Sequence, residues 1–279
     1  MEYFFDADKP HWAAWCQVQM IDKQWELFVP EKGLEDSDTF PLYYASLGGF
    51  YDLAEHLVGK HLEHINARSG QMVTPLVAAL HGKHFEVAEL LHWNGVDVDV
   101  RDKDGDTPLC IASLSGILHI IQWLLNHEVD VNTQGFNSYS PLHSAASNGY
   151  LQAFQMLIEH NADIHIRNAF GMTPLHVAVT VSISGLDRNV IDIMQVLLDH
   201  GANPNAWDND NSTPLYHSSW WQTELYPPCR GTVEGTRLLL KHGAIIDTED
   251  NEGRTPLQLA LEHGREEIVT CLKDHGATR

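Results

Sequence analysis

Thr173-Pro174-Leu175-His176 belongs to a motif that the chain repeats at a nearly constant interval. A Pro-Leu step occurs at seven places, which are Pro41, Pro75, Pro108, Pro141, Pro174, Pro214 and Pro256. The successive spacings are 34, 33, 33, 33, 40 and 42 residues. Self-similarity at a period near 33 residues indicates a repeat protein, in which each repeat packs mainly on its neighbours.

Each copy of the motif predicts the start of a short helix. In Thr107-Pro108, the threonine hydroxyl is suited to accept a backbone N–H bond, and proline fits the first helical turn because its missing donor costs nothing there. Small residues such as Ala145 and Ala178 follow. They keep this inner helix thin, so we expect neighbouring repeats to pack closely.

A second, outer helix follows in each repeat. Apolar residues recur in it at three- and four-residue spacing, as at Ile117, Ile121 and Leu124, which is typical of one buried helix face. Glycines that favour a left-handed helix end follow at Gly95, Gly201, Gly243 and Gly276. Turn-forming segments, such as 102–105, 168–171 and 250–253, then lead into the next repeat.

The Thr-Pro-Leu-His core resembles the T-P-L-H-x-A motif of ankyrin repeats. This resemblance implies an all-α solenoid of about seven helix-turn-helix repeats with projecting β-hairpin fingers. The repeats would start near residues 40, 74, 107, 140, 173, 213 and 255, within an ankyrin-repeat domain spanning 40–279.

A narrower resemblance is carried by 10–15 (PHWAAW), 41–45 (PLYYA) and 74–79 (TPLVAA). These segments are similar to the ankyrin region of fungal NACHT-containing, NOD-like receptor proteins. That resemblance implies a recognition part of a larger signalling or immune-type assembly. The chain contains no GxxxxGK[ST] motif, so nucleotide binding does not carry over from those receptors.

Two features depart from the repeat. Residues 1–39 do not match it but are rich in aromatic residues, and we expect this segment to cap the first repeat by covering its core. The alternative is a docking site for a partner domain. The fifth and sixth repeats are longer, with extra residues at 182–189 and 222–232, between inner and outer helices. These insertions are either part of a binding face or tolerated loop growth.

Composition narrows the classes of partner. The net charge of −21 would repel phosphate backbones and anionic lipid headgroups, which argues against nucleic acid. No apolar run approaches the length of a membrane span, and acidic residues stand where a secretory signal needs positive charge. Four scattered cysteines form no disulfide framework. We expect a monomer without membrane association in the cytoplasm, with the nucleus as the alternative.

Ankyrin proteins usually bind on the concave face made by fingers and inner helices, so the resemblance implies a protein or peptide partner there. The finger positions of this face are Arg101, Lys103, Asp104, Phe136, Asn137, Tyr139, Arg167, Phe170, Met172, Trp207 and Asn209. The inner-helix ends supply Leu114, Ser147, Asn148, Trp220 and Trp221. Aromatic residues dominate interface hot spots, which favours the six aromatic positions. The alternative is that fingers pack on one another and that Trp220 and Trp221 cover the second insertion.

The histidines recur at fixed repeat positions, which indicates structural roles. His127, His160, His200, His242 and His275 come near the end of the outer helix, where we expect them to bond backbone groups. We expect no metal site and no cofactor, since no tight His/Cys/Asp cluster has coordination spacing.

We expect no enzyme activity. The alternative function is a small-ligand or catalytic protein that uses the inserted loops, with Cys229 activated beside Arg230 and assisted by His217 and Glu224. A purely structural spacer is a third hypothesis.

Overall fold

The computed structural model describes residues 41–68, 74–127, 129–180, 187–219 and 230–278. The chain divides into two compact units, Met1–Ile111 and Ala112–Arg279. The predicted capping segment 1–39 lies outside the described residues, as do Trp220, Trp221 and most of both insertions.

The first unit is built from paired helices. Its elements are α2 (Pro41–Gly48), α3 (Tyr51–Lys60), the 3₁₀ helix η1 (Leu62–His64), α4 (Pro75–His81), α5 (Phe85–Trp93) and the start of α6 (Pro108–Ser115). The inner helices α2 and α4 pack side by side, as do the outer helices α3 and α5.

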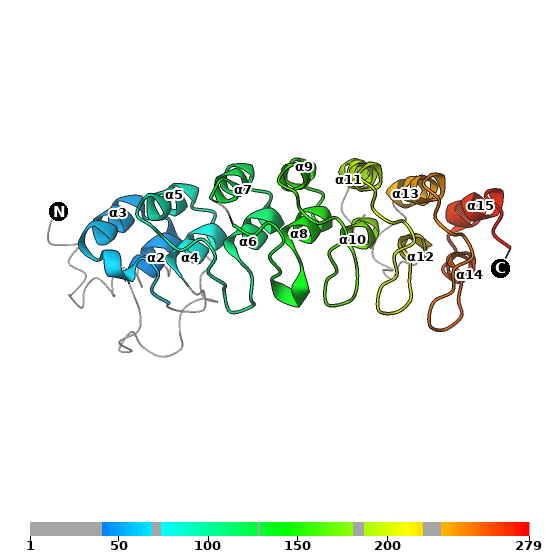
Figure 1. Cartoon of the computed structure of the whole chain (residues 1–279), viewed down its shortest axis with the longest axis horizontal. Coiled ribbons are helices and arrows are strands. Elements are labelled where there is room, and N and C mark those ends of the chain that lie inside the picture. Colours follow the sequence, from blue (N-terminus) through cyan, green and yellow to red (C-terminus); the bar gives the residue numbers. More distant parts are fainter. Residues whose placement is uncertain (1–40, 69–73, 128, 181–186, 220–229, 279) are drawn as a thin grey trace. The chain divides into compact units, whose positions relative to one another are not determined.

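The second unit continues the same pairing (Figure 1). After the end of α6, it contains α7 (Leu118–Leu125), the 3₁₀ helix η2 (Phe136–Ser138), α8 (Pro141–Ser147), α9 (Leu151–Glu159), α10 (Pro174–Thr180), α11 (Asp187–Asp199), α12 (Pro214–Ser219), α13 (Arg230–Lys241), α14 (Pro256–Glu262) and α15 (Glu266–Asp274). Inner helices α8, α10, α12 and α14 form one row and the outer helices a second, with the fingers projecting beyond the inner row. The predicted all-α arrangement is confirmed for the described residues.

The predicted helix starts are confirmed by their hydrogen bonds. The hydroxyl of Ser140 accepts the N–H of His143 at 3.3 Å, and that of Thr255 accepts the N–H of Gln258 at 3.3 Å. The side chains of His143 and Gln258 each accept the cap residue's N–H in return. Such reciprocal capping satisfies two donors that the first helical turn leaves unpaired.

Close packing of the inner helices follows from their small residues. Ala145, Ala146, Ala178 and Ala260 are fully buried, so each inner helix lies directly against its neighbours. Larger apolar residues of the outer helices, with Phe154 the largest, fill the space behind them. Each buried apolar side chain of this kind contributes about 1.5–3 kcal/mol to folding.

The two insertions are partly helical, which refines the prediction of loops. α11 has 13 residues and α13 has 12, whereas α9 of the preceding repeat has 9. The last residues of 182–189 and 222–232 therefore add a turn to the start of each outer helix.

The fingers differ from the predicted β-hairpins, since no strand occurs in the parts of them that the structure describes. Each is closed by one backbone bond across four residues, such as Asn168 N–H to the Met172 carbonyl at 3.0 Å. The N–H of Met172, which would continue a hairpin ladder, instead donates to the side chain of Asn168 at 3.0 Å. A side chain thus replaces the second rung, and no strand pair forms.

Candidate protein-interaction surface

An aspartate or asparagine side chain organises most of the described fingers. Its Oδ1 accepts the N–H groups two and four residues later at 2.8–3.0 Å, and this arrangement recurs at Asp102, Asn168, Asp208 and Asp250. Asx turns of this kind replace backbone pairing and limit the conformations of the loop. The backbone of these fingers is therefore held in one conformation, which fixes the direction in which their side chains leave it.

Four fingers of the second unit, here called the finger row, are also bonded to one another. They comprise residues 134–139, 167–172, 207–212 and 249–254. The N–H of Ala169 donates to the Asn137 carbonyl at 2.9 Å, and that of Asn209 to the Phe170 carbonyl at 3.0 Å. The N–H of Asn251 donates to the Asp210 carbonyl at 3.2 Å. Each finger thereby fixes the position of the next.

The first of these fingers uses a different device. Gly135 stands at the Asx position, and the neighbouring Gln134 side chain donates to the Ser138 carbonyl at 2.9 Å and to the Arg167 carbonyl at 2.8 Å. Asn137 adopts φ 51°, a left-handed conformation that asparagine tolerates. This finger is turned differently from the others but remains bonded to its neighbour.

Large aromatic side chains project from three successive members of the finger row. Phe136 is 55% exposed, Phe170 51% and Trp207 43%. Tyr139 is half-buried and packs against His143 with ring centroids 5.4 Å apart. Leu114, at the end of α6, is 49% exposed. Four large apolar side chains among the predicted contact residues of the second unit are thus exposed.

Three of the predicted polar contact residues are exposed and also form hydrogen bonds within the finger row or their own finger. Arg167 donates to the carbonyl of Gly171 at 2.9 Å, and Arg101 donates to that of Gly105 at 2.7 Å. Asn209 donates to the Ala169 carbonyl at 3.0 Å. Both arginines therefore close their own fingers, a role that the sequence did not suggest.

The remaining predicted positions fall into three groups. Ser147 and Asn148 donate to the Ser144 carbonyl and cap the end of α8, while Met172 is half-buried in its finger. The exposed Lys103 and Asp104 share a finger with Arg101 in the first unit. Trp220 and Trp221 are outside the described residues, so their placement stays a prediction.

The second oxygen of the finger carboxylates binds an inner helix, a feature that the sequence analysis missed. Asp208 Oδ2 lies 2.7 Å from His217 Nε2, and Asp250 accepts bonds from the Tyr216 hydroxyl and, at 2.9 Å, from Arg254. Although burial alone would raise it, the pKa of Asp250 falls to about 2 because these donors stabilise the carboxylate. Burial and the adjacent carboxylate together raise the pKa of Tyr216.

His217 lends no support to the catalytic alternative, because only 10% of its side chain is exposed and its Nε2 is bonded to the buried carboxylate of Asp208. Although burial opposes it, the pKa of Asp208 is lowered by the bond from His217 and by backbone donors. Cys229 and Glu224 lie outside the described residues. His217 and Asp208 therefore join helix and finger, and their pairing is accounted for by the fold.

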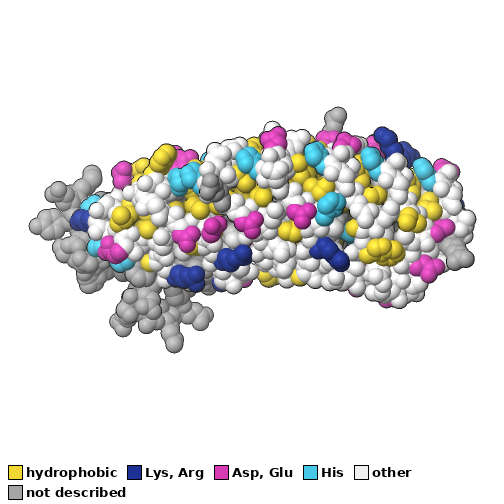
Figure 2. All heavy atoms as spheres, viewed as in Figure 1, with side chains coloured by type: hydrophobic (Ala, Val, Ile, Leu, Met, Phe, Trp, Pro, Cys, Tyr) yellow, Lys and Arg dark blue, Asp and Glu magenta, His cyan; other side chains and the backbone are white. Residues whose placement is uncertain are grey.

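The outer-helix histidines occupy the predicted structural role. The Nδ1 of each donates to the carbonyl four residues earlier at 2.6–2.9 Å, in His127, His160, His200, His242 and His275. These bonds satisfy carbonyls that the end of an α-helix leaves unpaired. Histidine side chains accordingly recur along the outer-helix row of the second unit (Figure 2).

His143 and His176 are buried and link consecutive repeats. Nδ1 of each ring lies within 3.2 Å of the backbone N–H of the cap residue of its own inner helix. Nε2 of His143 lies 3.0 Å from the Met172 carbonyl, and Nε2 of His176 lies 3.2 Å from the Ser212 carbonyl. Burial lowers the pKa of both imidazoles to about 4. Both side chains are therefore neutral at pH 7.

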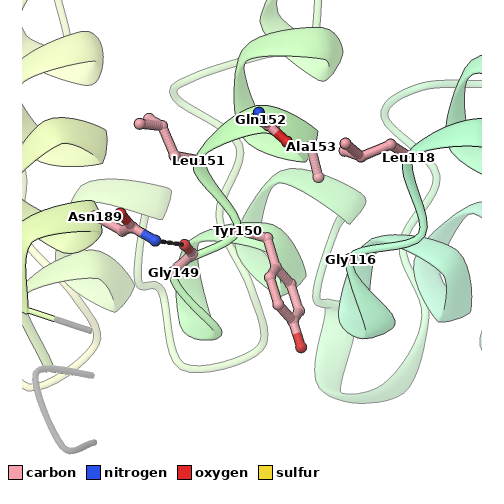
Figure 3. A pocket seen from close by; sticks show the side chains of 8 residues that line it. All are labelled: Gly116, Leu118, Gly149, Tyr150, Leu151, Gln152, Ala153 and Asn189. Atoms are coloured by element: carbon pink, nitrogen blue, oxygen red, sulfur yellow. Dashed lines mark hydrogen bonds between the residues drawn. The ribbon is translucent and has the colours of Figure 1, made fainter. Parts of the chain in front are cut away.

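A cavity of about 300 Å³ lies away from the finger row and is lined by the turns that precede α7 and α9 and by Asn189 of α11. Tyr150 covers Gly116, where an added Cβ would approach the ring to 2.7 Å. Asn189 donates to the Gly149 carbonyl at 3.1 Å on the opposite side of the cavity (Figure 3). Its lining contains no charged side chain among the residues that border it.

The comparison with known families agrees with the repeated helix pairs and fingers. Ankyrin repeats (3 copies) match residues 76–168, 157–225 and 229–278, which together exceed half of the chain. This chain belongs to the ankyrin-repeat family. Ankyrin repeats are general protein-interaction modules, and their fold is typically a non-catalytic scaffold. No described helix has the length and apolar character required to cross a bilayer.

Two relatives share part of this ankyrin-repeat chain. Alpha-latrocrustotoxin-Lt1a of Latrodectus tredecimguttatus is 33% identical over 72 residues, which are 26% of this chain and 5% of the relative. A putative ankyrin repeat protein of Rickettsia felis is 41% identical over 70 residues, which are 25% of this chain and 30% of the relative. The chain thus covers only 5% and 30% of the length of these relatives. Neither relative is a fungal receptor, so the resemblance to fungal NACHT-containing proteins stays a prediction.

Proposed function

We propose that this ankyrin-repeat protein binds a partner protein or peptide through the concave face that bears its finger row. The observation that carries the proposal is the exposure of Phe136, Phe170 and Trp207 by 43–55% on three fingers that are bonded to one another. Exposed aromatic side chains on a preorganised surface are typical binding anchors, because little conformational entropy is lost when a partner covers them.

The charge of the protein narrows the chemistry of the partner. Asp210 is exposed in the same finger as Trp207, and the whole chain carries a charge of −21, which outweighs the exposed guanidinium of Arg167 in the neighbouring finger. An acidic surface attracts basic partners and steers them by long-range electrostatics. We therefore infer a partner with apolar anchors flanked by lysine or arginine. The cellular role that we propose is recognition of this partner within a larger signalling or immune-type assembly.

The test compares capture by the wild-type protein, the Phe170→Ala/Trp207→Ala double variant and the control Ile245→Ala. Ile245 is 56% exposed but lies after α13, outside the finger row, so its replacement removes apolar surface elsewhere. We expect the double variant to lose at least about tenfold in binding of the captured partner, as for two hot-spot residues, and the control to retain it. Circular dichroism checks that all three proteins are folded.

The partner is identified by mass spectrometry after affinity purification from cell extract and is then titrated in purified form. Equal affinity for the wild type and the double variant would refute the site. Absence of any specific partner would instead favour the structural-spacer hypothesis.

A further inference from the structure

A compact cluster of metal-ligating side chains lies just after α3 in the first unit. His61 Nδ1 is 3.4 Å from Glu63 Oε1, and His64 Nε2 is 4.0 Å from the same carboxylate oxygen. One ligating atom from each of the three residues lies within 4.8 Å of the others. The side chains come from one short turn, since Glu63 and His64 belong to η1 and His61 precedes it.

These separations are compatible with one coordinated ion. In a tetrahedral zinc site with bonds of 2.0–2.2 Å, neighbouring ligand atoms lie about 3.4 Å apart. The His61–Glu63 separation already has that value, the His64–Glu63 separation of 4.0 Å has to shorten by about 0.6 Å, and the ligand atoms of the two histidines lie within 4.8 Å of each other. The imidazole rings are stacked, with an interplanar angle of 13° and centroids 5.5 Å apart, so one ring has to turn before both nitrogen lone pairs point at the same ion.

Accessibility permits an ion to enter and the side chains to adjust. The His61 and His64 side chains are 32% and 33% exposed, and that of Glu63 is 65% exposed. In the described residues, no other group of three His, Cys, Asp or Glu side chains has comparable spacing.

We propose that His61, Glu63 and His64 bind a divalent transition-metal ion of the Zn²⁺ class. Two imidazoles and one carboxylate are borderline-to-hard ligands that suit Zn²⁺, Co²⁺, Ni²⁺ or Cu²⁺, whereas Mg²⁺ and Ca²⁺ require mainly oxygen ligands. Three protein ligands leave a fourth position open for water. The proposal is independent of partner binding at the finger row and revises the expectation that the chain has no metal site.

The position of the cluster gives metal binding a structural consequence. The same turn leads to Asn66, whose Oδ1 accepts the N–H of Asp97 from the following repeat at 2.8 Å. An ion that ties residues 61–64 together therefore restrains the segment from which this link between repeats is made. Because ligands that bind only the folded state stabilise it, Zn²⁺ is expected to raise the melting temperature of the protein.

Isothermal titration calorimetry with ZnCl₂ on the full chain, purified without a polyhistidine tag, tests the proposal. We expect one Zn²⁺ per chain in the wild type and at least about tenfold weaker binding in His61→Ala/His64→Ala, because two of three ligands are lost. Glu63→Gln removes the anionic ligand with little change of shape and is also expected to weaken binding. His56→Ala/His119→Ala removes two exposed histidines outside the cluster and serves as the matched control.

Two outcomes would overturn the metal site. The first is a wild-type protein that binds no Zn²⁺, and the second is equal Zn²⁺ affinity in the wild type and the His61→Ala/His64→Ala variant. Cobalt supplies an independent readout, since Co²⁺ in a four-coordinate site absorbs strongly in the visible range. This absorption is expected in the wild type and the control variant, and its persistence in both cluster variants would contradict the assignment. Mg²⁺ at the same concentration is expected to give no binding heat.

Discussion

Replacing His143 and His176 together by glutamine tests how buried imidazoles couple the repeats to pH. Both residues follow the Ser-Pro-Leu or Thr-Pro-Leu step and contact a carbonyl of the next repeat. Gln258 occupies the equivalent position in the last repeat and forms the same reciprocal cap with Thr255. Glutamine therefore keeps the helix start and removes the titratable group.

The magnitude follows from the pKa values. Burial lowers the pKa of both histidines from 6.5 to about 4. Well above pH 6.5 both side chains are neutral in the folded and unfolded states, so their burial does not reduce the free energy of unfolding there. As the pH falls below 6.5, these histidines become protonated in the unfolded chain but stay neutral in the folded protein. The free energy of unfolding therefore decreases until about pH 4, where the folded protein is protonated as well. At 1.36 kcal/mol per pH unit, each histidine removes about 2 kcal/mol between pH 7 and pH 5, and the pair about 4 kcal/mol.

Urea denaturation followed by circular dichroism at pH 7 and pH 5 measures this difference. The double variant is expected to be less stable than the wild type at pH 7, because each lost bond to a carbonyl contributes about 1 kcal/mol. Its loss of stability between pH 7 and pH 5 is expected to be smaller by about 4 kcal/mol. His165→Gln, at an exposed position, is the control. An equal loss in the wild type and the double variant would refute the reasoning.

Three further substitutions test the packing and the turns. Phe154→Ala is expected to lower the free energy of unfolding by about 3–5 kcal/mol in urea titrations, because this side chain is fully buried, whereas Ile245→Ala is expected to change it by less than about 0.5 kcal/mol. Gly201→Ala is expected to cost about 1 kcal/mol in thermal unfolding, since φ is 87° and no atom obstructs the added methyl group; an unchanged melting temperature would contradict this. Asp208→Ala is expected to destabilise the protein by about 1–3 kcal/mol, because it removes both the Asx turn and the bond to His217. Asp208→Asn is expected to destabilise it less, because Asn168 shows that an asparagine keeps the turn, and similar losses in the two variants would contradict the role of the turn.

The parts of the fold that could be predicted are those set by interactions within a few residues. A Ser or Thr cap reaches three residues, a helix-end histidine bonds a carbonyl four residues back, and apolar spacing marks the buried face of one helix. Because each signal occurs in several copies, chance matches are easily separated from the pattern. The expectation of β-hairpin fingers was wrong because the repeat motif does not show which acceptor the backbone N–H groups of a finger bind. In the finger of Asn168, the N–H of Met172 donates to the Asn168 side chain instead of to a backbone carbonyl.

The candidate surface was predictable only in outline. Sequence position indicated that Phe136, Phe170 and Trp207 lie in fingers, but their exposure depends on how neighbouring fingers bond. Arg101 and Arg167 were expected to offer positive charge to a partner, yet both donate to a carbonyl of their own finger. A long side chain can reach several acceptors, and the backbone conformation of the turn selects among them.

The sequence was sufficient to predict the repeat period, the starts of the inner helices and the structural role of the repeated histidines, because these depend on local bonds that recur along the chain. Tertiary structure decided which finger side chains stay exposed and which carboxylates meet an inner helix. Those outcomes depend on side-chain direction and on contacts between repeats, including bonds such as Tyr216 to Asp250 that join residues 34 positions apart.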